Sequence, residues 1–173
     1  MNSINNKSEM TSRVLNCGAL PQGELASLLQ RYDMQLVMVA DDENIPGSYW
    51  GDSEAGLINN QLYVRSDTPV HSALHEACHY ICMDQAWRQA LDTDAGGGYD
   101  EENGVCYLQI LLSDHIDSMG KQRMFADMDT WGYSFRLGSS QAWFEQDAAD
   151  ARQWLLDTGL LDANYQPSWK LRQ

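Results

Sequence analysis

The chain has 173 residues, a length that suits a single compact domain. Hydrophobic residues make up 43% of the sequence, which is enough for a packed core and argues against extensive disorder. With 25 acidic and 11 basic residues, the formal net charge is −14, which disfavours binding to nucleic acid or to an anionic membrane surface.

Residues 1–19 are rich in Asn and Ser, and we expect a flexible N-terminal arm followed by one domain over residues 20–173. The first twenty residues lack the apolar segment of a secretory signal, and no apolar run approaches the about 20 residues that a membrane-spanning helix needs. The sequence has no CxxC pair, so its cysteines are expected to be reduced, buried thiols of a cytoplasmic protein. They are Cys17, Cys78, Cys82 and Cys106.

The first part of the domain is predicted to contain a helix, a strand and a hairpin. A stripe of leucines predicts a helix from Pro21 to about Tyr32. The continuous apolar run Gln35–Ala40 predicts a central strand. Alternating apolar and polar side chains around the turn Asn59-Asn60 predict a β-hairpin over residues 57–65.

Helices are predicted to dominate the rest of the chain. Asp67 or Thr68 can cap a helix that begins near Pro69. The expected elements are this helix to about Met83 with an extension over residues 85–91, a loop at Gly96–Gly98, helices at Glu101–Met119 and Gln122–Met128, a strand or loop at Trp131–Gly138, and a last helix from Ser139 or Ser140. These elements predict an α+β fold.

The sequence His75-Glu76-Ala77-Cys78-His79 matches the pattern HExxH within the helix that follows the hairpin. Residues four apart lie on one helical face, about 6 Å apart along the axis, so His75 and His79 can reach one metal ion. Glu76 can accept a proton from water that the metal has made acidic, without being a ligand itself. The alternative is a surface helix that carries two unrelated histidines. We predict one divalent metal ion, with Glu76 as the catalytic base.

Two histidines leave a metal ion under-coordinated, so a third protein ligand is needed. His71 lies about 12 Å from His79 along the helix axis, too far to share one ion, and we expect it beside the site, at its rim or exposed. The next helix begins with Asp100, Glu101 and Glu102, any of which can supply a carboxylate. Helical phase favours Glu102 and makes Glu101 the second choice, although acidic residues also favour a helix N-terminus through its dipole alone.

The HExxH pattern followed by a glutamate on the next helix resembles the gluzincin group of zinc metallopeptidases. The resemblance implies a zincin-like fold, in which a small sheet or hairpin packs on the HExxH helix with two or three further helices. It also implies His75, His79 and Glu102 as metal ligands and Glu76 as the base.

A closer local likeness is to the elongation factor P hydroxylase family. Ser72–Tyr80 is similar to that family's Ser-Ala-Leu-His-Glu-x-x-His-aromatic run, and its second helix also begins with a glutamate followed six residues later by leucine, here Glu102 and Leu108. The likeness covers mostly residues 70–112. It implies a non-haem iron site of two histidines and one carboxylate, with an oxidative reaction on a modified lysine.

Several other side chains have both a functional and a structural interpretation. Tyr80 and Tyr99 can stabilise an oxyanion or pack structurally, and Arg136 can hold a substrate carboxylate or form a surface ion pair. Tyr49-Trp50-Gly51 can line a cleft or pack in the core. The remaining candidates are Asp127 and Asp129, as partners of the ligand histidines or as solvent-exposed residues, and His115, which lies about 20 Å along its helix and is discounted.

We therefore expect residues 20–173 to form a metal-binding catalytic domain, and the first functional prediction is a zinc metallopeptidase-like hydrolase. The Gln61–Arg65 hairpin can offer an edge strand that aligns an extended peptide or protein substrate. The alternatives are an iron(II)-dependent hydroxylase acting on a protein side chain, and a non-catalytic binding module that contains a metal. The expected cofactor is one divalent ion, zinc before iron.

Overall fold

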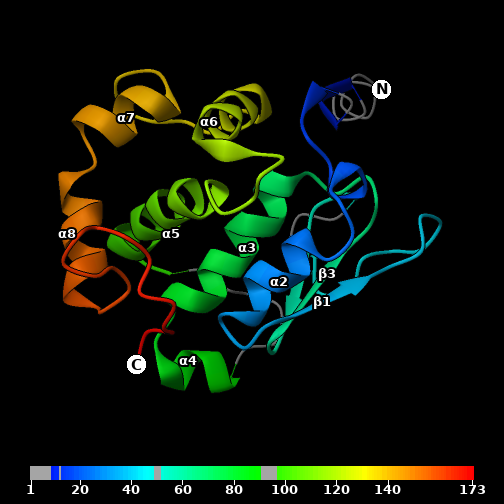
Figure 1. Ribbon diagram of the computed structural model, residues 1–173, viewed down its shortest axis with the longest axis horizontal. Coiled ribbons are helices and arrows are strands. Elements are labelled where there is room, and N and C mark those ends of the chain that lie inside the picture. The colour runs from blue at the N-terminus through cyan, green and yellow to red at the C-terminus, as the bar shows by residue number, and fades with distance from the viewer. Residues whose placement is uncertain (1–8, 12, 49–51, 91–96) are drawn as a thin grey trace.

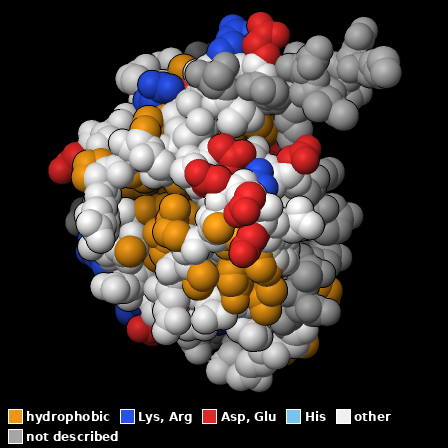
Figure 2. Space-filling view, turned by 90° about the vertical axis from the view of Figure 1, so that its right-hand side faces the viewer, with side chains coloured by type: hydrophobic (Ala, Val, Ile, Leu, Met, Phe, Trp, Pro, Cys, Tyr) orange, Lys and Arg blue, Asp and Glu red, His pale blue; other side chains and the backbone are white. Residues whose placement is uncertain are grey.

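The structure is a computed structural model, and it describes residues 9–11, 13–48, 52–90 and 97–173 (Figure 1). Within these ranges the chain forms the expected α+β fold, with one small mixed sheet and a larger set of helices. None of the described helices is both long enough and apolar enough to cross a bilayer. The face shown in Figure 2 places acidic side chains beside hydrophobic ones, in keeping with the acidic composition.

The sheet has three strands in the order β1-β3-β2. The antiparallel hairpin β2 (Gly56–Ile58) and β3 (Gln61–Val64) was expected from the sequence, and Asn59 takes the positive φ of 52° that its turn requires. Strand β1 (Gln35–Met38) pairs parallel to β3 and lies at the edge, with Met38 55% exposed. The prediction of a central strand at Gln35–Ala40 is therefore wrong, because a short apolar run does not show how many of its sides are covered.

The helices confirm most of the predicted positions but not all of their ends. They are α2 (Glu24–Gln30), α3 (Val70–Cys82), α4 (Gln85–Ala90), α5 (Tyr99–Ser113), α6 (Gly120–Trp131), α7 (Ser140–Gln146) and α8 (Ala149–Asp157). Helix α5 ends at Ser113 rather than Met119, because the chain then turns toward Gly120, whose φ is +78°. Ser139 accepts a hydrogen bond from the backbone of Ala142 and so caps α7 as predicted.

Two predicted helices are interrupted where the backbone leaves the helical region. Met83 is extended, so α4 is separate from α3 rather than an extension of it. The expected last helix is two helices, because Asp147 leaves the helical region and α8 begins only at Ala149. The segment 132–139 between α6 and α7 contains no strand, which settles the prediction of strand or loop in favour of loop.

Helix α3 lies between the sheet and α5 and contacts both, so it forms the centre of the molecule (Figure 1). Helix α5 also packs against α6 and α8. Gly104 allows the close approach of α8, since a Cβ there would lie 2.6 Å from the ring of Trp154. The core thus packs α3 against α5, which fixes the relative position of the side chains between them.

The prediction of a flexible N-terminal arm over residues 1–19 extends too far along the chain. Residues 1–8 and 12 lie outside the described residues, but Val14 and Cys17 are buried and the backbone of Cys17 donates a 2.8 Å hydrogen bond to Thr68. The backbone of Leu15 donates to the carboxylate of Asp127 at 2.8 Å. The polar composition of the segment hid these few apolar residues, which are enough to attach it to the domain.

Candidate metal centre

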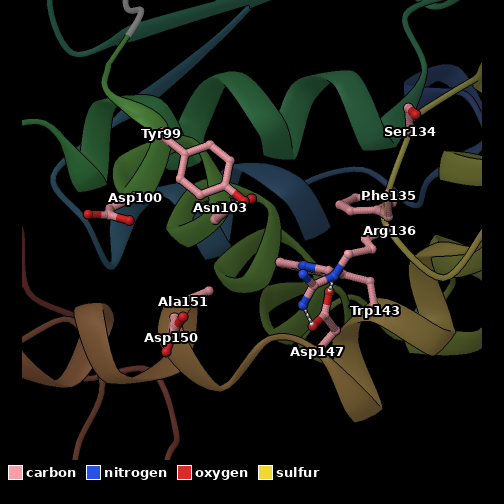
Figure 3. Close-up of a pocket in the computed structure, with 10 residues that line it drawn as sticks. All are labelled: Tyr99, Asp100, Asn103, Ser134, Phe135, Arg136, Trp143, Asp147, Asp150 and Ala151. Carbon is pink, nitrogen blue, oxygen red and sulfur yellow. Dashed lines mark hydrogen bonds and ion pairs between the residues drawn. The ribbon is translucent and has the colours of Figure 1, made fainter.

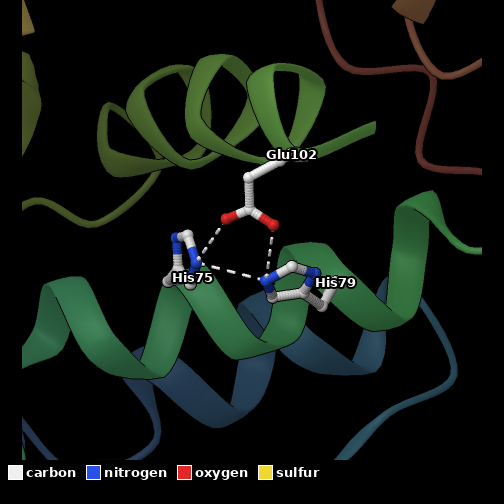
Figure 4. Close-up of side chains that lie close together, drawn as sticks. All are labelled: His75, His79 and Glu102. Carbon is white, nitrogen blue, oxygen red and sulfur yellow. Dashed lines mark hydrogen bonds and ion pairs between the residues drawn. The ribbon is translucent and has the colours of Figure 1, made fainter. Parts of the chain in front are cut away.

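Helices α3 and α5 bring His75, His79 and Glu102 together across their interface (Figure 4). The Nε2 atoms of the two histidines are 3.2 Å apart. Glu102 Oε1 lies 3.2 Å from His75 Nε2, and Glu102 Oε2 lies 3.4 Å from His79 Nε2. The histidines share a face because they are one helical turn apart, and Glu102 faces them because it begins the helix that packs against α3.

The spacing of these three donors fits one metal ion. Zinc lies about 2.0–2.2 Å from nitrogen and oxygen ligands, so tetrahedral geometry separates the ligand atoms by roughly 3.3–3.6 Å. The observed separations of 3.2 to 3.4 Å are close to that value. Two imidazoles and a carboxylate suit zinc and also non-haem iron. The cluster can therefore hold one divalent ion, and its donors do not choose between the two metals.

The electrostatics of the cluster favour a positive charge at its centre. Burial opposes a charge on His75, but Tyr133, Cys106 and Glu102 together raise the pKa of His75 above its ordinary value. Burial also opposes the ionised form of Glu102, but its hydrogen bond with His75 and the charges of both histidines lower the pKa of Glu102. Glu102 therefore stays ionised beside the two imidazoles, and its negative charge can pair with a bound cation.

Glu101, the second choice for the third ligand, lies outside the cluster. Its Oε1 is 3.1 Å from Nη1 of Arg172, near the C-terminal end of the chain. Burial raises the pKa of Glu101, and Arg172 opposes that rise. Adjacent residues on a helix point about 100° apart, so only one of the two glutamates can face His75 and His79. The structure brings Glu102 to them.

A cavity of about 480 Å³ opens beside the cluster, and the side chain of Glu76 lines it together with His75 and Glu102. Burial raises the pKa of Glu76 to about 7, against the opposing charge of His75. A carboxylate with a pKa near neutrality can both accept and return a proton. Glu76 thus lines the cavity that opens beside the cluster of His75, His79 and Glu102.

Another part of the cavity lining comes from the segment after α6, which includes Tyr133. Gly132 takes a φ of +100° at the end of α6, and this left-handed residue turns the chain back toward α3. Burial raises the pKa of Tyr133 to about 12, so its hydroxyl keeps its proton and remains a donor. Trp131 donates a 3.0 Å hydrogen bond from Nε1 to Glu54, and both residues line the cavity.

His71 is buried, with 1% of its surface exposed, which excludes the rim and exposed positions and agrees with the expected position beside the site. Its Nδ1 lies 3.1 Å from the hydroxyl of Tyr133, and its ring packs against Trp131. Burial, and then the charge of His75, lower the pKa of His71 to about 3. His71 therefore stays neutral and supports the cavity wall. It does not belong to the ligand cluster, as expected from its distance to His79 along the helix.

Sequence reasoning missed two residues that shape the site, Gln109 and Tyr133. Gln109 is fully buried and its Oε1 lies 2.9 Å from Nδ1 of His75. Its signal in the sequence is a single amide within the apolar stripe of α5. Tyr133 lies in an aromatic segment that was noted only for Arg136, and no pattern indicates which of its rings returns to α3.

The other candidates have structural roles or lie elsewhere. Tyr80 is buried beneath the guanidinium of Arg88 and does not line the cavity. Arg136 is an exposed ion-pair partner of Asp147 (Figure 3). His115 packs against Trp169, away from the cluster, as expected from its distance. The segment Tyr49-Trp50-Gly51 lies outside the described residues.

Neither Asp127 nor Asp129 contacts the ligand histidines. Asp127 was expected to be exposed, but it is buried, and its other carboxylate oxygen accepts a 2.8 Å hydrogen bond from Arg123. Asp129 is exposed as expected, and its carboxylate accepts a 2.9 Å hydrogen bond from the backbone N–H of Ser140. Both carboxylates therefore fasten neighbouring segments to α6 rather than orient metal ligands.

A second cavity of about 290 Å³ adjoins the first and shares Asn103, Ser134 and Phe135 with it (Figure 3). Tyr99 lines this second cavity and is 83% exposed, so it has neither of the two roles considered from the sequence, a place at the metal site or structural packing.

Comparison with known proteins gives no relative: no family model, no curated protein and no solved structure matches the chain.

Proposed function

We propose that this chain is a metal-dependent hydrolase in which His75, His79 and Glu102 hold one divalent ion, with zinc as the first choice, and Glu76 is the catalytic base. One observation supports the proposal above all others. Three donors from two helices stand at the spacing of a metal ion's ligands, and a carboxylate with a pKa raised to about 7 lines the cavity beside them. A carboxylate with a strongly raised pKa in a cavity marks a candidate functional site.

A divalent ion in this site would supply Lewis acidity, which acidifies water and polarises a carbonyl group. The carboxylate of Glu76 accepts the proton of the attacking water and returns it to the leaving group. Tyr133 lines the same cavity, and its hydroxyl can accept a hydrogen bond from His71 while it donates to the oxygen on which negative charge develops. His71 holds that hydroxyl in place at 3.1 Å.

The proposed substrate remains a peptide or protein, but the hairpin cannot align it as the sequence suggested. Strand β3 is the central strand and pairs with a neighbour on each side. On the outer side of β2, the backbone N–H of Leu57 already donates to Gly47 at 3.3 Å. An added strand would have to displace this contact. We therefore place the substrate in the cavity between α3, α5 and the segment after α6.

The two neighbouring glutamates provide the sharpest test of the site. Glu102→Gln removes the ligand charge and should weaken zinc binding on the order of 10²-fold, while Glu101→Gln should change it by less than about twofold. Titration of metal-free protein with zinc and iron(II), followed by elemental analysis, measures both effects. Equal losses in the two variants, or no metal bound by the unmodified protein, would contradict the assignment.

The role of the base is tested separately. Glu76→Gln should retain the metal and lose turnover by at least about 10²-fold, because the amide cannot accept the proton. Turnover is measured by mass spectrometry on a peptide library incubated with zinc-loaded protein. A variant that keeps full turnover would show that Glu76 is not the base.

A second candidate is an iron(II)-dependent hydroxylase acting on a protein side chain. It is supported by the two-histidine, one-carboxylate donor set and by the aromatic walls of the cavity, Trp131, Tyr133 and Phe135, together with the local likeness to elongation factor P hydroxylase. It predicts substrate-dependent consumption of dioxygen by iron(II)-loaded protein in the presence of a reductant. Zinc-loaded protein should be inactive in the same assay, whereas the hydrolase proposal predicts the reverse.

A further inference from the structure

The side chain of Gln109 links α5 to α3 behind the candidate metal ligand His75. It is fully buried on α5, seven residues and about two turns after Glu102, so it faces α3 on the same side of its helix. Its Oε1 lies 2.9 Å from Nδ1 of His75, and its Nε2 lies 3.0 Å from the backbone oxygen of His71. A buried amide with both ends engaged is restricted to one orientation.

Contacts on the nitrogen side show which way the amide points. The backbone oxygen of His71 can only accept a hydrogen bond, so the NH₂ group of Gln109 must face it. The sulfur of Met124 lies 3.5 Å from the same nitrogen and is also an acceptor. A flipped amide would place its oxygen against two acceptors and leave its donors facing His75. The carbonyl end of Gln109 therefore faces His75.

An amide oxygen accepts hydrogen bonds and cannot donate them, so Nδ1 of His75 must carry the hydrogen of this contact. The position of that hydrogen determines what the other ring nitrogen can do. With Nδ1 protonated, the lone pair of the neutral imidazole is on Nε2, the atom that faces His79 and Glu102. A histidine in the opposite tautomer would present an N–H to the cation.

We propose that Gln109 is a positioning residue that fixes His75 in its Nδ1–H tautomer and thereby makes Nε2 the metal-binding nitrogen. The inference rests on the proposed metal site for its purpose, but the tautomer is a property of the chain alone. Groups that hydrogen-bond to ligand histidines commonly contribute 10–100-fold to metal affinity, so the loss of Gln109 should be of that order.

The test uses Gln109→Met, which keeps a similar volume without polar atoms, and Ser113→Ala as a matched control. Ser113 is also buried on α5, one turn further on, and its hydroxyl donates to Ile110. Zinc and cobalt(II) affinities are measured by competition with a chelator. Gln109→Met should bind both ions 10–100-fold more weakly, while Ser113→Ala should match the unmodified protein. Equal affinity in Gln109→Met and the unmodified protein would overturn the proposal.

Nitrogen-15 NMR of the imidazole rings gives an independent readout that a purely structural role would not change. In metal-free protein, at a pH where His75 is neutral, the hydrogen should be on Nδ1, and Gln109→Met should shift it wholly or partly to Nε2. A hydrogen on Nε2 in the unmodified protein would overturn the role of Gln109. If the unmodified protein binds no cation, the proposed function fails, and this spectrum still decides the tautomer.

Discussion

One wall of the metal cavity consists of the two packed helices α3 and α5, whereas the other is an irregular segment that begins at the end of α6. In the helical wall, the ligand positions follow from helical period and from one interhelical contact. In the irregular wall, the hydroxyl of Tyr133 contacts His71 at 3.1 Å and Gln109 at 3.5 Å, and its ring packs against His75 and Phe135. The first wall carries the cluster that can hold a metal ion, and the second is a loop, the kind of segment that is generally more mobile than helices.

His71 is the point where the two walls meet, and it should dominate the response of the fold to acid. Its pKa is about 3 in the folded chain against an ordinary value of 6.5. The unfolded chain therefore takes up a proton first as the pH falls below 6.5. Stability from this group is complete above pH 6.5 and decreases toward pH 3 by up to about 4–5 kcal/mol.

Replacement of His71 by asparagine should remove much of that dependence, since asparagine can still bond Tyr133 but does not titrate. The free energy of unfolding of metal-free protein, measured in urea from pH 4 to pH 7, should fall less steeply in His71→Asn than in the unmodified chain. His115→Asn is the control, because His115 is only partly buried and its change should be small. Parallel pH profiles for His71→Asn and the unmodified chain would contradict the burial argument.

Tyr133 tests whether the irregular wall contributes to chemistry or only to shape. Tyr133→Phe keeps the ring and removes the hydroxyl, so it should lower kcat by about 10²-fold if that group stabilises an oxyanion. Metal affinity should stay within about threefold, because the ligands belong to the helical wall. Phe135→Leu, a change in the same wall without a hydroxyl, should alter KM more than kcat. A tenfold loss of zinc binding in Tyr133→Phe would show that the walls are not separable.

The helical wall could be predicted from the sequence and the irregular wall could not. Residues four apart on a helix share a face in any fold, so His75 and His79 were placed together without knowledge of the rest. The approach of Glu102 required only that the next helix pack on the same face. The return of Tyr133 to α3 depends on where α6 ends and on a contact with His71 across the core, which local patterns do not contain.

The same distinction between local patterns and long-range contacts explains the errors in the prediction of the fold. The hairpin at Asn59 was predicted because its turn is a local property, whereas the edge position of β1 depends on which strand lies beside it. The attachment of Val14 and the burial of Asp127 depend on each other. The carboxylate of Asp127 accepts a hydrogen bond from the backbone N–H of Leu15, the residue that follows Val14. Composition alone predicts a polar, unattached segment at residues 1–19 and an exposed Asp127.

The smallest expected effect concerns Arg172, which forms an ion pair with Glu101. Arg172→Gln removes a partly buried ion pair and should destabilise the fold by about 1 kcal/mol, measured by urea unfolding. Zinc affinity should change by less than about twofold, because the carboxylate of Glu101 faces away from His79. A double variant with Glu101→Gln and Arg172→Gln should then lower the free energy of unfolding by little more than Arg172→Gln alone. If Arg172→Gln instead alters metal binding tenfold, Glu101 competes with Glu102 once it is released. The third ligand would then depend on the C-terminal segment rather than on helical phase alone.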